Sequence, residues 1–177
     1  PIDSQNLPSL IMNVITVITD INVILNNSSL TKAKANLELA NTYLQQGKKG
    51  FAKGALENAQ TQLLTALFVM PDTYREQVIT ILSNAENIYD RALFGNGGYS
   101  KSTLQKDLTT LQKALEPAQT YLLSKKTAGK DVHIQVRYIQ LITEKIQDAA
   151  SALSINNLPK AFILTRSSKV ILSKSRQ

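Results

Sequence analysis

One turn between two amphipathic segments, within residues 33–71, constrains this chain more than any other stretch. Before the turn, Leu37, Ala40 and Leu44 recur at steps of three and four, which places them on one face of a helix. The matching apolar positions after the turn are Ala52, Leu56, Ala59, Leu63 and Ala66. Gly47 adopts the positive φ that ends a helix at little cost. Because the turn is short and the facing residues are small, we predict a close antiparallel helical hairpin.

Apolar residues at helical spacing recur along the whole chain, and Leu, Ala, Gln, Lys and Asn dominate its composition. The first stripe is Leu10, Val14, Val17, Ile18, Ile21, Ile24 and Leu25. A later heptad seam is Leu104, Leu108, Leu111, Leu115, Ala118 and Leu122, which suits either closure of the monomer or pairing of two copies. We therefore predict an all-α fold: a single domain over residues 1–177, built as an antiparallel helical bundle of stacked hairpins with about seven helices.

Several residues indicate where these helices begin and end. The candidate N-terminal caps are Ser29 or Thr31, Thr73 with Glu76, Ser102 with Gln105, and Asp131. Pro117 is expected to kink the helix that contains it or to divide it into two. The glycine-rich residues 94–99 are interpreted as a connector, because the buried strand and the Gly-Lys-Ser/Thr of a P-loop are missing.

The predicted hairpin resembles one tetratricopeptide unit. The resemblance rests on six positions: Ala40, Tyr43, Gly47, Ala52, Leu56 and Ala59. Thirty-four residues further on, Tyr74, Gln77 and Ile81 do not repeat the pattern, so the chain is not an array. The stretch that ends at Met70 and Pro71 also resembles the bacterial YfdX-type helical proteins. The resemblance implies a surface that binds another protein, with Tyr43 and Gly47 in the candidate groove.

No residues form a plausible catalytic group or metal site. The single histidine, His133, is expected at the surface of a first helical turn, and no nucleophile-elbow motif accompanies it. There is no Glu-x-x-His pair for a di-metal bundle, and no cysteine for a thiolate site or a disulfide. We predict that the protein is not an enzyme and needs no cofactor.

The net charge of +7 and the pI of about 9.6 favour acidic partners. No acid follows Asp148, whereas five basic residues do. The candidate anionic-surface patch is Lys48, Lys49, Lys125, Lys126, Lys160, Arg166, Lys169 and Lys174. Alternatively, these residues bind no anionic surface: the last helix packs on the bundle through its apolar side, and its lysines face water near the negative end of the helix dipole.

These observations lead to a non-enzymatic helical interaction protein, a scaffold or chaperone-like molecule that binds another protein. The alternative is a basic protein that binds an anionic membrane or nucleic acid, and an oligomer remains open. The composition favours a bacterial source. Because the chain starts at Pro1 without Met, we expect a periplasmic or secreted protein whose signal was removed, with a cytoplasmic one as the alternative. No stretch is expected to reach the length of a membrane span.

Overall fold

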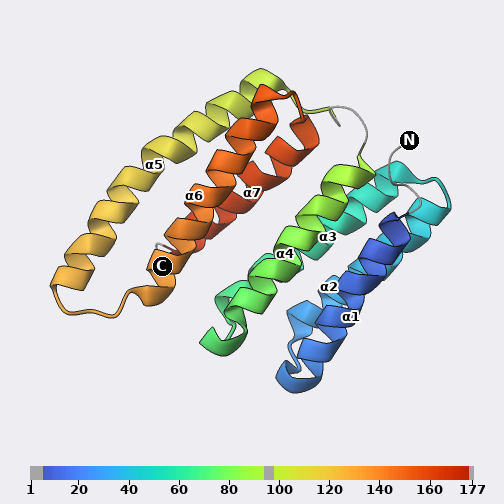
Figure 1. Cartoon of the computed structure of the whole chain (residues 1–177), viewed down its shortest axis with the longest axis horizontal. Coiled ribbons are helices and arrows are strands. Elements are labelled where there is room, and N and C mark those ends of the chain that lie inside the picture. The colour runs from blue at the N-terminus through green and yellow to red at the C-terminus, as the bar shows by residue number, and fades with distance from the viewer. Residues whose placement is uncertain (1–5, 94–97, 176–177) are drawn as a thin grey trace. The chain divides into compact units, whose positions relative to one another are not determined.

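The computed structural model describes residues 6–93 and 98–175, and within them it contains seven α-helices and no strand (Figure 1). The all-α prediction is confirmed. The helices are α1 (Leu7–Leu25), α2 (Ser28–Gln45), α3 (Lys49–Phe68), α4 (Asp72–Ala92), α5 (Lys101–Thr127), α6 (His133–Ser154) and α7 (Leu158–Ser175). Most of the predicted 94–99 connector, together with Pro1 and Arg176, lies outside the described residues.

The helices gather into two compact units, residues 1–94 and residues 95–177. The first contains α1 to α4 and the second contains α5 to α7. The sequence led us to expect one domain over residues 1–177, and that expectation stays a prediction.

The first unit is a ring of four helices in which α1 packs on α2, α2 on α3, α3 on α4, and α4 on α1 (Figure 1). Short connections make successive helices antiparallel. The predicted hairpin is confirmed as α2 and α3, the most extensive helix pair of the unit. Ala40 and Ala59 are fully buried in it, so the backbones approach closely. At its turn, Gly47 has φ +71° and ends α2 as expected.

Helix α1 buries a different face from the one predicted. Val14, Ile18 and Ile21 are buried as expected, but Val17 is 46 % exposed and Ile24 66 % exposed. Ile11 and Ile15 take their places in the core. The polar residues Ser9, Asn13, Thr16 and Asp20 line the side of α1 opposite Ile11 and Ile18, and Val17 and Ile24 lie next to this polar stripe and not on the buried face.

The same helix corrects the expectation that no stretch is long enough to cross a membrane. An 18-residue window of this 19-residue helix has a mean hydropathy of 1.7, so the helix is long and apolar enough to cross a membrane, judged by length and composition alone. The core helix of a soluble protein and a signal sequence pass the same test, and about a third of the stretch is buried.

Most of the predicted helix caps are wrong by one to four residues. Asn27 caps α2 by accepting a hydrogen bond from the Leu30 backbone N–H, in place of Ser29 or Thr31. Ser100 caps α5 and accepts from the Thr103 N–H, in place of Ser102. Thr73 was predicted to cap α4, but this helix begins at Asp72, directly after Pro71, and has no side-chain cap. Asp131 precedes the capping residue of α6 but still accepts from the His133 N–H, at 3.1 Å.

The second unit consists of three helices, α5, α6 and α7, each packed on the other two (Figure 1). The heptad seam of α5 lies inward: all its members are buried except Leu115, which is half-buried. The seam therefore packs within its own chain. Helix α5 continues through Pro117 without the break that we considered.

Candidate binding cleft between α5 and α7

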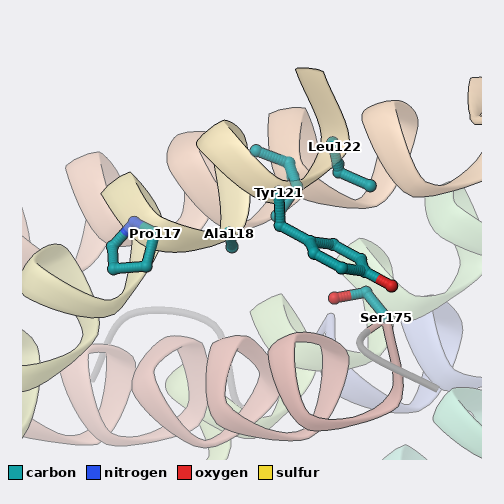
Figure 2. A pocket seen from close by; sticks show the side chains of 6 residues that line it. Pro117, Ala118, Tyr121, Leu122 and Ser175 are labelled. Atoms are coloured by element: carbon teal, nitrogen blue, oxygen red, sulfur yellow. The ribbon is translucent and has the colours of Figure 1, made fainter. Parts of the chain in front are cut away.

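Two cavities lie one after the other along the α5–α7 interface. The first, of about 430 Å³, is lined by Pro117, Ala118, Tyr121, Leu122, Ile139 and Ser175 (Figure 2). The second, of about 420 Å³, is lined by Asp107, Thr110, Leu111, Ala114, Lys169, Leu172 and Ser173. We call the two together the α5–α7 cleft. Both volumes fall in the range of ligand-binding pockets in proteins, about 300–1,000 Å³.

One face of α5 lines the whole cleft. Its eight contributing residues, from Asp107 to Leu122, follow one another at steps of one and three, as residues along one helical face do. At 1.5 Å per residue, this face is about 22 Å long. Helix α6 packs against both α5 and α7 and runs antiparallel to each, so α5 and α7 run in the same direction. Their C-terminal ends therefore lie at the same end of the unit.

The helices α5 and α7 are joined near their N-terminal ends. There the ring of Tyr99 stacks on that of Phe162, with ring centroids 4.0 Å apart and planes at 9°. Further along, Nζ of Lys169 lies 2.9 Å from Oδ2 of Asp107. Beyond Pro117, only Ala118 and Leu122 of α5 are buried. The unit is therefore closed at one end and hollowed at the other.

The lining combines an apolar floor with a polar rim. Leu111, Leu122 and Ile139 are buried beneath the two cavities. In Figure 2 the Tyr121 side chain extends from α5 and its hydroxyl points toward that of Ser175 at the end of α7. Tyr121 remains 52 % exposed. Such a surface suits an amphipathic ligand, because its floor buries apolar groups and its rim offers hydrogen bonds.

One end of the cleft is strongly basic. Lys125 and Lys126 lie in the last turn of α5, and Lys174 lies in the last turn of α7. Nζ of Lys125 is 5.2 Å from the centroid of the Tyr121 ring, within the range of a cation–π contact. We call Lys125, Lys126 and Lys174 the basic end. These cations also lie beside the negative ends of two helix dipoles, a favourable position.

The charge of the chain is concentrated in this unit. Residues 95–177 contain thirteen Lys and Arg against five Asp and Glu, which gives +8. Residues 1–94 contain seven against eight, which gives −1. The basic balance seen in the whole sequence is therefore a property of the second unit, and it favours acidic partners there.

The structure brings together only part of the predicted basic patch. Lys125 and Lys126 share the last turn of α5 and Lys174 lies in the last turn of α7, which runs in the same direction, whereas Lys160 lies fourteen residues before Lys174, about 21 Å away along α7. Lys169 pairs with Asp107, and Arg166 is half-buried. Lys48 and Lys49 belong to the first unit, in the turn before α3 and at its first residue.

The other candidate groove residues lie in the first unit. The ring of Tyr43 meets that of Phe51 across the α2–α3 turn, with centroids 5.3 Å apart. Gly47 is exposed in the same turn. A groove at Tyr43 and Gly47 stays a prediction.

His133 lies where the sequence placed it, exposed at the first residue of α6. Its Nδ1 is 2.6 Å from Oδ1 of the exposed Asp131. Within residues 6–93 and 98–175, no three or more His, Cys, Asp and Glu side chains come together to hold a metal ion.

The chain matches no protein-family model, no curated protein and no solved structure. The resemblances of residues 33–71 to a tetratricopeptide unit and to YfdX-type proteins therefore stay predictions.

Our sequence interpretation missed the cleft itself. The heptad seam of α5 pointed to a single buried stripe, yet Asp107, Thr110, Ala114, Pro117 and Tyr121 follow the same spacing beside it. This second, more polar stripe was the available signal. A helix with two adjacent stripes presents a second face that its own neighbours need not cover.

Proposed function

We propose that this protein is a non-enzymatic helical binding protein whose second unit holds a segment of another protein in the α5–α7 cleft. The observation that carries the proposal is the alignment of two cavities along one face of α5. Helical proteins commonly bind partners in grooves between helices. Holding a segment of another protein needs no reactive group, so such a surface suits a scaffold or chaperone-like role.

The experiment is site-specific photo-crosslinking within α5. A benzoylphenylalanine at position 121 replaces an exposed aromatic ring of the cleft rim, and one at position 119 lies two residues away, at an exposed site on another side of the same helix. In cells that naturally make the protein, position 121 is expected to form an adduct with a defined protein that position 119 does not form. The purified pair must then bind in solution. Adducts that are absent, or equal at both positions, contradict the proposal.

A second candidate function is binding to an anionic membrane or nucleic acid, and the charge of +8 in residues 95–177 favours it. Such binding releases counterions, so the logarithm of the binding constant falls linearly with the logarithm of salt concentration. Vesicles of anionic phospholipid and a labelled DNA duplex, each titrated at several salt concentrations, test it. Equal affinity at low and high salt contradicts it.

A further inference from the structure

We infer that the occupant of the α5–α7 cleft is an amphipathic helix of a partner protein, antiparallel to α5 and α7 and acidic in its first two turns. This rests on the proposed function and adds the conformation, direction and charge of the bound segment. Four observations support it: the number of helices in each unit, the length of the cleft, its lining and its charge.

The first observation is the difference between the two units. In the first, four antiparallel helices close a ring. Among its described residues the second has three helices, with α5 and α7 parallel to each other and both antiparallel to α6. In an up-down-up-down bundle, a fourth helix lies between the first and the third and runs opposite to both. The cleft between α5 and α7 lies at that position.

The second observation is length. The cleft face of α5, from Asp107 to Leu122, covers about 22 Å, which is four helical turns. A partner helix of about 15 residues has the same length.

The third observation is the lining of the cleft. The two alanines on the cleft face, Ala114 and Ala118, leave room for a second backbone to approach. The exposed side chains of Pro117 and Tyr121 offer apolar surface to residues i, i+3, i+4 and i+7 of an amphipathic helix, above the buried floor of Leu111, Leu122 and Leu172. The hydroxyls of Thr110, Tyr121, Ser173 and Ser175 suit the polar edges of such a helix.

The fourth observation is the charge of the cleft ends, which sets the direction of the bound helix. An antiparallel helix places its N-terminus at the basic end, beside Lys125, Lys126 and Lys174. Asp and Glu are favoured in the first turn of any helix, because they interact well with the positive end of its dipole. At the other end, Lys169 is already paired with Asp107. The cleft therefore favours acids at the N-terminal end of its ligand.

The experiment selects ligands without knowing the partner. A display library of 18-residue amphipathic helices, with a fixed apolar stripe and randomised polar positions, is selected on the full chain. Enriched peptides are expected to carry Asp or Glu in the first two turns. Replacing Lys125, Lys126 and Lys174 together by Glu is expected to weaken them about tenfold or more, because close charge pairs couple strongly. Lys101→Glu, one charge reversal at the opposite end of α5, is the matched control for Lys126→Glu alone and is expected to change affinity less than about twofold.

Reversing the charges on both the peptide and the chain distinguishes a variant that has lost the binding site from one that has lost its fold. Peptides whose N-terminal acids are replaced by Lys are expected to bind the triple Glu variant better than the original chain. Ala114→Trp, which fills the cleft, is expected to abolish binding of the enriched peptides. Circular dichroism of each variant verifies that the helices are retained.

Four results overturn the inference: no enrichment, acids placed evenly or near the C-terminus, affinity unchanged by Ala114→Trp, or no gain on the charge swap. Binding of the basic end to phosphatidylglycerol vesicles, without peptide enrichment, also overturns it and assigns the site to lipid headgroups. If crosslinking at position 121 identifies a partner while the library yields no acidic helix, the proposed function stands and this inference fails. If crosslinking yields none, the proposed function fails first.

Discussion

Nζ of Lys169 in α7 lies 2.9 Å from Oδ2 of Asp107 in α5, and this ion pair bridges the two helices beside the cleft. Both side chains remain partly in water, at 51 % and 34 % exposed, so solvent screens their attraction. Asp107→Asn is expected to lower the free energy of unfolding by no more than about 1 kcal/mol. The loss should shrink in about 1 M salt, where the Debye length is near 3 Å. Urea unfolding at low and high salt measures both, and a salt-independent loss above 2 kcal/mol contradicts this prediction.

Two glycines of the α2–α3 hairpin should respond in opposite ways to the same substitution. Gly54 lies in α3, and a Cβ there meets no atom within 4 Å, so Gly54→Ala should stabilise by about 0.5–1 kcal/mol. Gly47 has equal space but φ +71°, so Gly47→Ala should destabilise by about 1–2 kcal/mol. Thermal unfolding of both variants provides the comparison. Shifts of the same sign would show that φ at the turn does not control stability.

Pro117 lies within α5, at an exposed position on the cleft rim. It has no N–H, so the Lys113 carbonyl lacks the hydrogen bond that another residue would donate there. Pro117→Ala restores this hydrogen bond, but alanine also gives the unfolded chain more conformational freedom, which offsets part of the gain. The net effect is expected to stabilise the second unit by about 1–3 kcal/mol. Denaturant unfolding is the measurement. An unchanged or lower midpoint would contradict it.

The hydroxyl of Thr165 is buried in α7 and has no hydrogen-bond partner. Thr165→Val keeps the shape and removes the unsatisfied group, so a gain of about 1 kcal/mol is expected. Thr143 in α6 is the matched control, because its hydroxyl donates a 2.8 Å hydrogen bond to the Ile139 carbonyl. Thr143→Val should lower stability by about 0.5–1.5 kcal/mol. Calorimetry of the two variants tests the pair, and equal effects would refute the argument.

The sequence by itself determined the number and type of the helices. Helical period and propensity act between residues three and four positions apart, so they are visible without the fold. The alanines of the α2–α3 hairpin and the leucines of the α5 seam were readable for this reason. Gly47 was readable because only its own backbone angle is involved.

Only the tertiary structure decided which faces the helices bury. In α1, Ile11 and Ile15 are buried and Val17 and Ile24 are exposed, although both pairs fit a helical stripe. The cleft depends on how α5 packs beside α7, and the basic end depends on the two helices running in the same direction. Packing between helices that are distant in the sequence brings residue 107 to residue 169 and residue 121 to residue 175. No local rule encodes such packing.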